Sequence, residues 1–593
     1  NFNTMKDFLK YMLATILGLI ATTTLFVILG IISLAGMVAS SSSAPEIQKE
    51  SVFVLELKGN IIERYQASPL DQFLGEELPT YGLDDLLAAI KKAQDNEKIL
   101  GIYLHPQVFA CSPASLQSIR RALVDFKQSG KFLVAYGDSY TQEGYYLASA
   151  ADKIIVNPSG SISWHGLSVQ TMFFKDLLDK LGVEMQIFRV GTYKSAVEPF
   201  ISTQMSEANR MQNQAFANSI WGQILNEVAT SRNLPADSLN RLADRNMDFQ
   251  LAETYVQNGM ADTLMYQDQV LSYLKEITET DEDSKLRTVS LDDMINTQTL
   301  TPKDKSGNII AVYYAYGDID GSTSAYDGIH SEKVCNDLRK LREDESVKAV
   351  VLRVNSPGGS AYGSEQIWRE VTLLKEQKPV IVSMGDYAAS GGYYISCAAD
   401  WIVAEPTTLT GSIGIFGMIP NAQKLVTEKI GIRMDGVKTN QLADMGNLTR
   451  PFTPEEANLI QQMVNNGYEL FTRRCAEGRN IPLDELKRIA EGRVWTGEMA
   501  KDIRLVDELG GLDAAIAVAK ERAEVENYTL VSYPQKEDFL SLLLQTNTER
   551  YISQKLQGQL GQFGTWYHSL SLLKNLGERD YLQARIPFVL NIH

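Results

Sequence analysis

The longest uninterrupted apolar stretch of the chain lies near its beginning. No charged residue occurs between Lys10 and Glu46, and the run 11–38 is dense in Leu, Ile, Val, Ala and Phe. About 20 apolar residues span a bilayer, whereas the apolar part of a cleavable signal has roughly 7–15. The run therefore predicts an uncleaved transmembrane anchor, with a flexible serine-rich linker after it. A buried core helix and a cleaved signal with an unusually long apolar region are the alternatives.

The charges before this stretch predict its orientation. Lys6 and Lys10 precede the apolar run, and basic residues favour the cytoplasmic side of a membrane, although Asp7 weakens the signal. We therefore expect a single-pass protein with a cytoplasmic N-terminus, an exported remainder and the lipid bilayer as a partner.

After the anchor, short β-rich runs alternate with segments of helical pattern. In the second half of the chain the expected strands are 309–314, 349–354 and 379–384, and the expected helices between them are 331–343 and 363–376. Apolar strands separated by helices of this length are typical of parallel βαβ units, so we predict an α/β fold with helices covering the sheet. A long amphipathic helix is expected over 453–477, because Thr453 is a good N-cap and Pro454 suits the first turn.

An internal repeat covers most of the chain. Residues 144–152 match residues 392–400, which lie 248 positions later, and residues 232–235 match 479–482 at a spacing of 247. Two matches at nearly one spacing predict two domains of one fold.

The repeat sets the expected domain boundaries. These are a cytoplasmic tip, anchor and linker (1–45), a first repeat domain (46–275), a linker (276–306), a second repeat domain (307–530) and a C-terminal extension (531–593). The extension has no counterpart in the repeat, and it could pack on a neighbouring subunit or cap the domain.

Length and composition limit the classes of function and partner to be considered. A chain of 593 residues is too long for one core, and a net charge of −17 disfavours nucleic acid as a partner. Four widely spaced cysteines without a C-x-x-C pair predict free buried thiols rather than a zinc or disulfide framework. No metal-binding or nucleotide-binding motif is visible, so no cofactor is expected.

Two glycine-rich turns of the second half carry candidate chemistry. The strand 349–354 leads into Ser356-Pro357-Gly358-Gly359, and the strand 379–384 leads into Ala389-Ser390-Gly391-Gly392. Paired glycines leave backbone N–H groups open to a ligand, because no Cβ blocks the approach. These are the parts of an acyl-transfer site in which the Ser390 hydroxyl attacks a carbonyl carbon and the N–H groups of Gly359 and Gly391 hold the oxyanion. Each of these donors typically lowers the activation barrier by roughly 3–4 kcal/mol. A purely structural glycine turn is the alternative.

Four motifs in combination resemble those of the signal peptide peptidase A family in its long, tandem-repeat, membrane-anchored form. They are Asn355-Ser356-Pro357-Gly358-Gly359, Ala388-Ala389-Ser390-Gly391-Gly392-Tyr393-Tyr394, Leu409-Thr410-Gly411-Ser412-Ile413-Gly414 and Gly191-Thr192-Tyr193-Lys194-Ser195-Ala196. The resemblance implies two tandem domains of the Clp protease and crotonase fold. It also implies that Ser390 is the nucleophile, Lys194 the general base and Ser412 the residue that orients the lysine, with Gly358 beside the oxyanion donors.

The same resemblance implies an activity and a setting. The expected protein is a serine endopeptidase that degrades cleaved signal peptides and other unfolded peptides. It would be held in the inner (plasma) membrane with its catalytic part on the periplasmic side, and it would form a homotetramer.

The repeat predicts one site shared by both halves. Ser390 shifted back by 248 positions falls on Gln142, so the first half has no nucleophile. Aligning the Gly182-Val183 pair with its counterpart in the second half places Ala443 at the position equivalent to Lys194, so the second half has no lysine at that position. Because a lysine must be uncharged to act as a base, we expect Lys194 to be enclosed near Ser390 without a carboxylate neighbour. Glu198 is the residue that could interfere.

Other interpretations remain at this stage. A Ser-His-Asp mechanism would need a histidine near Ser412, and His165 occupies the equivalent loop of the first half. A crotonase-like acyl-CoA enzyme would use the same paired N–H groups as an oxyanion hole. A catalytically inactive membrane scaffold would use neither the serine nor these N–H groups. Fold alone does not decide among them.

Overall fold

A computed structural model describes residues 2–41, 45–66, 79–297, 304–320, 328–536 and 582–586. Part of the expected serine-rich linker (42–44), part of the linker between the repeats (298–303) and most of the C-terminal extension lie outside the described residues.

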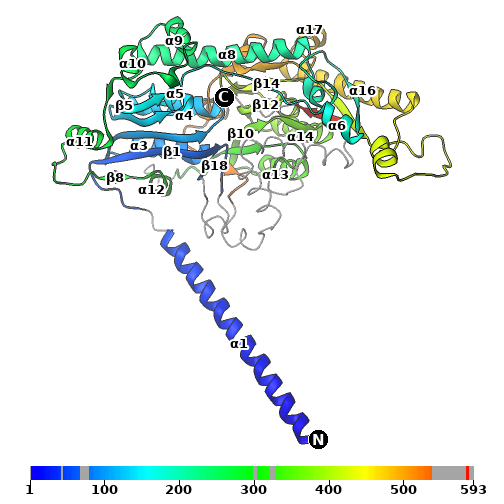
Figure 1. The fold of residues 1–593 in the computed structure, drawn as a ribbon, viewed down its shortest axis with the longest axis horizontal. Coiled ribbons are helices and arrows are strands. Elements are labelled where there is room, and N and C mark those ends of the chain that lie inside the picture. The colour runs from blue at the N-terminus through cyan, green and yellow to red at the C-terminus, as the bar shows by residue number, and fades with distance from the viewer. Residues whose placement is uncertain are drawn as a thin grey trace.

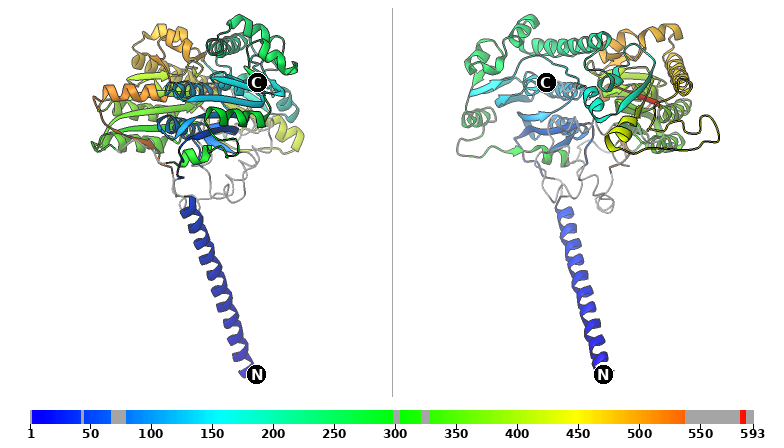
Figure 2. Two further views of the ribbon diagram at one scale, coloured as in Figure 1. Left: turned by 90° about the vertical axis from the view of Figure 1, so that its left-hand side faces the viewer. Right: turned by 45° about the vertical axis from the view of Figure 1, so that its right-hand side comes forward.

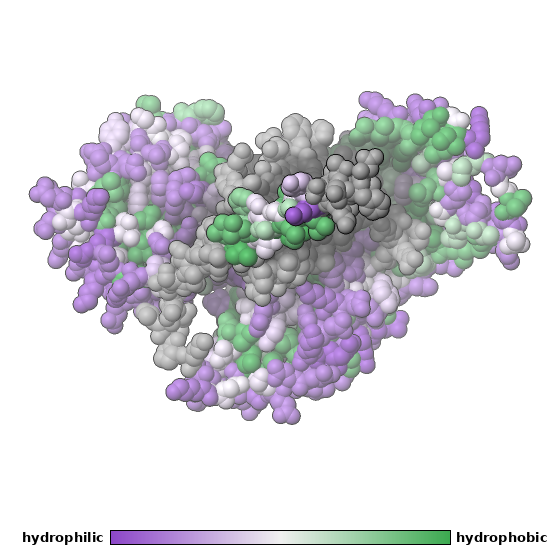
Figure 3. All heavy atoms as spheres, turned by 90° about the horizontal axis from the view of Figure 1, so that it is seen from below, coloured by the Kyte–Doolittle hydropathy of each residue, from purple (hydrophilic) through white to green (hydrophobic). Residues whose placement is uncertain are grey.

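The apolar run near the N-terminus forms one long helix, α1 (Phe2–Ser41), which projects away from the body of the protein (Figures 1 and 2). Its segment Lys10–Gly30 has the length and composition of a membrane span, and within the described part of the chain no second helix does. Figure 3 shows the protein from below, the side to which this helix projects, and apolar residues gather near the middle of that view, whereas hydrophilic residues dominate most of the body around them.

The first half is built on a sheet of parallel strands. Their order is β2-β1-β3-β4-β5-β7, and β8 pairs with β1. The strands are β1 (Ser51–Ile62), β2 (Thr80–Gly82), β3 (Ile99–Ala110), β4 (Phe132–Tyr140), β5 (Lys153–Ile162), β7 (Thr263–Leu264) and β8 (Thr288–Val289). The helices of this half are α3 (Leu83–Asp95), α4 (Pro113–Lys127), α5 (Gln142–Ala148), α6 (Lys175–Leu181), α7 (Glu198–Ile201), α8 (Glu207–Arg232), α9 (Ala236–Ala243), α10 (Ala252–Gln257), α11 (Gln267–Ile277) and α12 (Leu291–Asn296).

The second half repeats this plan around the order β16-β14-β12-β10-β9-β18, with β13 pairing with β12 and β17, except that β14 and β16 run antiparallel. Its strands are β9 (Ile309–Tyr316), β10 (Val347–Ser356), β12 (Val380–Ala389), β13 (Trp401–Ala404), β14 (Leu409–Gly411), β16 (Val494–Thr496), β17 (Glu508–Leu509) and β18 (Thr529–Tyr533). Its helices are α13 (Ser331–Glu343), α14 (Ala361–Lys375), α15 (Gly391–Ser396), α16 (Pro454–Arg479), α17 (Leu483–Ile489), α18 (Gly497–Asp502) and α19 (Leu512–Arg522). The predicted strands and helices of this half and the α/β fold class are confirmed.

Each of the two longest helices of the body packs on a strand of the other half. Helix α8 of the first half packs on β16 of the second, and α16 of the second half packs on β6 (Glu184–Arg189) of the first. Both helices end at an asparagine in the left-handed conformation, Asn233 with φ 51° and Asn480 with φ 50°. The predicted N-cap of α16 is present, since the Thr453 side chain accepts from Glu456 N–H. Packing of these two helices across the boundary fixes the position of one half relative to the other.

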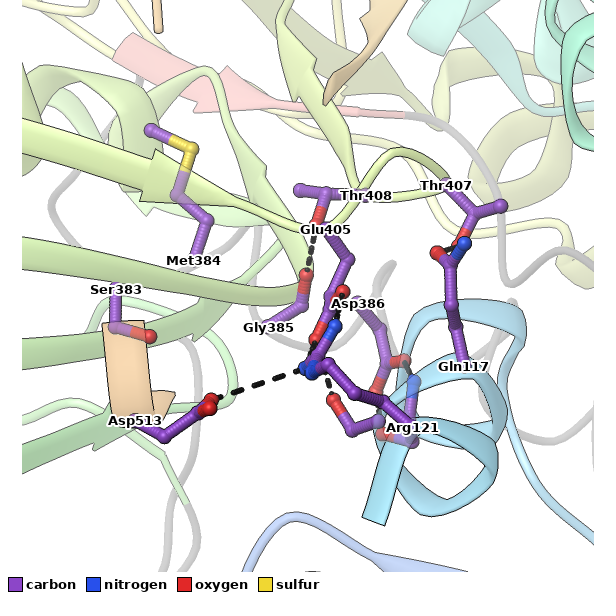
Figure 4. Close-up of polar contacts among 12 residues, drawn as sticks. Gln117, Arg121, Ser383, Met384, Gly385, Asp386, Glu405, Thr407, Thr408 and Asp513 are labelled. Atoms are coloured by element: carbon purple, nitrogen blue, oxygen red, sulfur yellow. Dashed lines mark hydrogen bonds and ion pairs between the residues drawn. The ribbon is translucent and has the colours of Figure 1, made fainter. Parts of the chain in front are cut away.

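Ion pairs and hydrogen bonds of charged side chains also join the two halves (Figure 4). Glu405 of the second half is fully buried and accepts hydrogen bonds from the Arg121 guanidinium (2.7 Å from Nη1) and from Ser118 Oγ (2.6 Å), both on α4. A second buried pair joins Arg353 to Glu63 (Nε to Oε1, 2.7 Å). A buried carboxylate is stable only when it is paired and hydrogen-bonded. These contacts therefore specify how the halves meet.

A small sheet crosses the boundary and draws strands from three parts of the chain. Its order is β11-β19-β15-β6. Strands β11 (Gly358–Ser360) and β15 (Phe416–Asn421) come from the second half and β6 from the first, while β19 (Leu582–Arg585) belongs to the C-terminal extension.

Candidate active site

Ser390 lies at a strained turn between β12 and α15. Its backbone has φ 56° and ψ −111°, a region that residues with a side chain rarely adopt. The turn is held because Ser390 N–H donates to Gly411 O at 2.7 Å and because the residue is fully buried. Strain of this kind persists only where the surroundings enforce it, and it is frequent at functional sites.

Lys194 reaches this serine from the first half. It follows β6 and immediately precedes a short 3₁₀ turn, Ser195–Val197. Its Nζ lies 2.7 Å from Ser390 Oγ and 3.1 Å from both the carbonyl oxygen and Oγ of Ser412. The structure therefore brings together the three side chains that the motifs single out.

Burial controls the charge of this lysine. Lys194 is 1% exposed, and burial holds the pKa of its amine well below the ordinary value. Glu198 is also buried, but its carboxylate accepts from Ser206 Oγ (2.6 Å) and Asn209 Nδ2 (2.9 Å) instead. The amine has the environment that favours its neutral form.

The hydrogen-bond partners around Nζ match a neutral amine. A neutral amine has two N–H donors and one lone pair. The Ser412 carbonyl and the Ser412 hydroxyl accept the two N–H groups, and that hydroxyl donates onward to Gly492 O at 3.2 Å. The lone pair is left for Ser390, whose hydroxyl can donate to it across 2.7 Å. This is the geometry required to remove the serine proton.

The wall around the lysine contains a glycine that sequence analysis did not identify. Gly492 has φ 75°, and a Cβ on it would lie 2.6 Å from Lys194 Cβ. The adjacent Glu491 O accepts from Tyr193 N–H at 3.0 Å, so the lysine segment is fastened to this turn. The Gly-Arg pair after Glu491 is a local turn signal, but nothing in the sequence links it to Lys194.

Gln212 is a second residue that sequence analysis missed. From α8 its Nε2 donates to Tyr193 O (3.1 Å) and Ser195 Oγ (2.9 Å), while its Oε1 accepts from Val494 N–H (3.2 Å). One amide thus joins both sides of the lysine segment to the second half. A glutamine within a helix belongs to no motif, so this role is visible only in the structure.

The glycines of the two turns meet beside the serine. Gly358 has φ 101°, and a Cβ on it would lie 2.8 Å from Gly391 N. The Gly391 N–H is therefore open to the small sheet only because position 358 has no side chain. Gly359 follows in β11 and presents its backbone to the same space, so both predicted oxyanion donors border one slot.

The corresponding places in the first half carry different groups. Gln142 Oε1 accepts from the backbone N–H groups of His165 and Gly166, both at 3.0 Å. The His165 ring is exposed, and its Nδ1 lies 3.1 Å from Gly166 O. Ala443 is exposed in the loop after β15. Among the residues that the structure describes, the side chain at hydrogen-bond distance from Ser390 Oγ is that of Lys194.

Comparison with known proteins agrees with this chemistry. The family model described as "Peptidase family S49" matches twice, at residues 125–281 and 372–526. Among curated proteins, Protease 4 of Salmonella typhi is 36% identical over 529 residues, covering 86% of this chain and 85% of its own. The chloroplastic serine protease SPPA of Arabidopsis thaliana is 34% identical over 81% of this chain and 70% of its own.

Two further matches are partial. The putative signal peptide peptidase SppA of Enterococcus faecium is 36% identical over 33% of this chain and 57% of its own. Among solved structures, a ClpP1 mutant of Listeria monocytogenes matches 35% of this chain and 94% of its own at 15% identity and a TM-score of 0.24.

The double family match and the long alignments decide between the peptidase and the acyl-CoA enzyme that the fold alone left open. The chain belongs to peptidase family S49 and is a serine peptidase.

Proposed function

We propose that this protein is a membrane-anchored endopeptidase that works through a dyad of Ser390 and Lys194. The observation that carries the proposal is the 2.7 Å contact between a fully buried serine hydroxyl and a lysine amine whose pKa burial depresses. A neutral amine at this distance removes the proton as the hydroxyl attacks a peptide carbonyl, and it later protonates the leaving amine.

The remaining site residues have supporting roles in this mechanism. Ser412 holds Nζ through two acceptors and directs its lone pair at Ser390. The N–H groups of Gly359 and Gly391 bind the oxyanion, and the missing side chain of Gly358 leaves room for it. Each oxyanion donor is worth roughly 3–4 kcal/mol of barrier. Each half supplies what the other lacks, and we assign the base to a first domain (46–275) and the acyl-accepting groups to a second (307–530).

The substrates we propose are cleaved signal peptides and other unfolded exported segments. The name of the Enterococcus faecium relative and the apolar span Lys10–Gly30 support this choice, because a tethered site lies close to membrane-derived peptides. Lys6 and Lys10 support a cytoplasmic N-terminus and a catalytic body on the exported side of the inner membrane. We further propose a homotetramer, which sedimentation in detergent tests directly.

The decisive experiment compares Ser390→Ala and Lys194→Ala with the full-length protein in detergent. Both variants are expected to lose cleavage of a synthetic signal peptide by a factor of about 10⁴ or more, as for other nucleophile–base pairs. A serine-reactive phosphonate is expected to label Ser390 in the full-length protein.

Matched controls are Ser129→Ala and Lys180→Ala, because both side chains are exposed on the first half. They are expected to retain full activity. Retained cleavage in a folded Lys194→Ala variant would contradict the dyad, and absence of a phosphonate adduct would favour an inactive scaffold.

A further inference from the structure

Two cysteines lie together in the core of the second half. The chain has four cysteines, and all of them carry free thiols in the structure. Cys397 directly follows α15, and Cys475 lies within α16. Both are fully buried in the same core cluster. By contrast, Cys111, which follows β3, and Cys335, in α13, are only partly buried.

The packing of α15 on α16 brings these two residues face to face. The ring of Phe471 in α16 stacks on that of Tyr394 in α15, with the ring centroids 4.3 Å apart. A Cβ on Gly478 would collide with the carbonyl oxygen of Cys397. Because residues 471, 475 and 478 share one face of a helix, Cys475 faces Cys397 between these two close contacts.

The thiol groups themselves are neighbours. Cys397 Sγ donates its proton to Tyr394 O at 3.2 Å, so it is free to accept a hydrogen bond from the Cys475 thiol. Burial, and next to it this hydrogen bond to Cys397, raise the pKa of the Cys475 thiol well above its ordinary value. A disulfide forms only between residues held close together, and two thiols in contact on packed helices meet that condition.

The first half has no cysteine at either equivalent position. In the repeat, Cys397 corresponds to Ser149 and Cys475 corresponds to Val228. Ser149 Oγ donates to Tyr146 O at 2.7 Å, so a serine takes the place of the thiol in the same local geometry. Val228 is buried in α8, as Cys475 is in α16. The fold therefore needs no thiol at these places, and the second half has one at both.

We propose that Cys397 and Cys475 form a disulfide bond when the chain folds outside the cytoplasm, and that this bond ties α15 to α16. Helix α15 begins at Gly391, the candidate oxyanion donor beside Ser390, and α16 packs on β6 of the half that carries Lys194. The cross-link therefore joins elements that position both sides of the site. The inference rests on the proposed exported position of the body, because cytoplasmic thiols are kept reduced.

The bond forms by exchange with an oxidant that itself carries a disulfide, such as an oxidised dithiol protein or oxidised glutathione. The thiolate of one cysteine attacks the oxidant, which gives a mixed disulfide and releases one oxidant thiolate. The thiolate of the other cysteine then attacks the first cysteine sulfur, and the second oxidant thiolate leaves. Two electrons pass to the oxidant, and its two thiolates take up the two protons. Because burial raises the pKa of the Cys475 thiol, the exchange precedes the packing of α16 on α15.

A count of free thiols in the full-length protein tests the inference. Membranes are dissolved in denaturant with N-ethylmaleimide before any reductant is added, and the intact mass gives the number of adducts. Two adducts are expected, on Cys111 and Cys335, instead of four. Cys397→Ser is expected to give three adducts, because Cys475 loses its partner. The matched control Cys111→Ser is expected to give one, because the pair remains.

The second measurement is thermal unfolding of the full-length protein in detergent. A cross-link that closes a loop of roughly 80 residues is expected to raise the melting temperature on the order of 10 °C. The double variant Cys397→Ser with Cys475→Val, which carries the residue types of the first half, is expected to melt lower by this amount. The control Cys111→Ser with Cys335→Ser keeps the pair and is expected to melt like the unsubstituted protein. Equal melting temperatures in the two double variants would overturn a stabilising disulfide.

The disulfide and the proposed exported position fail in different ways. Four adducts, both in protein from membranes and in protein refolded with oxidised glutathione, would overturn the disulfide and leave the proposed dyad intact. Four adducts in protein from membranes but two after that refolding would support the disulfide and overturn the exported position, because the chain then folds where thiols are kept reduced.

Discussion

Lys194 Nζ and Ser390 Oγ lie 2.7 Å apart, although 196 positions separate the two residues in the chain. The lysine comes from the first half and the serine from the second, and neither half offers both groups. The exchanged helices α8 and α16 and the buried ion pairs at the boundary hold them at this distance. Assembly of the halves is therefore a condition for the proposed chemistry.

The pH dependence of cleavage should report the charge of Lys194. Because burial lowers the pKa of its amine well below the ordinary value, the neutral form prevails at lower pH than for a free lysine. We expect kcat/KM for a synthetic peptide to rise with pH through this depressed pKa and then reach a plateau. A rise that continues to about pH 10.4, the ordinary lysine pKa, would contradict a buried neutral base.

The same pKa predicts how stability depends on pH. Between the depressed folded pKa of Lys194 and its ordinary unfolded pKa, the unfolded chain binds one more proton, so stability increases with pH by up to about 1.4 kcal/mol per unit. Lys194→Met lacks this contribution. Its stability relative to the unsubstituted protein is therefore expected to be greatest at low pH and to fall as pH rises, as measured by urea unfolding across pH. A difference that is constant with pH would contradict this linkage.

Gly358→Ala should block the site while leaving the fold in place. The added Cβ would lie 2.8 Å from Gly391 N and would collide with the strand in the slot, at a residue with φ 101°. We expect a loss of peptide cleavage by about 10²-fold or more, as for removal of an oxyanion donor, and a destabilisation of about 1–3 kcal/mol.

The matched control is Gly222→Ala in α8, where a Cβ would meet nothing within 4 Å. That variant should be fully active and up to about 1 kcal/mol more stable, because alanine favours a helix interior. Full activity in Gly358→Ala would show that the slot tolerates a side chain at this position.

Arg121→Met tests the boundary between the halves. It leaves the fully buried Glu405 without its guanidinium partner, so we expect a loss of stability on the order of 3–5 kcal/mol, measured by urea unfolding, and a fall in activity as Lys194 and Ser390 separate. The double variant Arg121→Met with Glu405→Met should recover most of the stability, because no unpaired charge then remains.

The control for this pair is Lys91→Met, which breaks an exposed ion pair with Asp95 and should change stability by less than about 0.5 kcal/mol. Equal effects of Arg121→Met and Lys91→Met would contradict a structural role of the buried pair.

Much of the architecture could be predicted from local pattern. The strands that became β9, β10 and β12, the helix over 331–343 and the capped start of α16 follow from periodicity and capping residues, which act over a few positions. The repeat spacing and the complementary losses at Gln142 and Ala443 also predicted that Lys194 and Ser390 would share a site. The family motifs identified Ser412, whose contact with the lysine the structure shows at 3.1 Å.

The tertiary structure alone decided which distant groups complete the site. Gly492 encloses the lysine, Gln212 fastens its segment to the second half, and residues 582–585 pass beside Gly359 as a strand. These relations join positions far apart in the chain, and the open strand edges that receive β19 exist only once the second half has folded. Periodicity and spacing describe what each segment forms by itself, whereas the neutrality of Lys194 depends on atoms from both halves that exclude water from it.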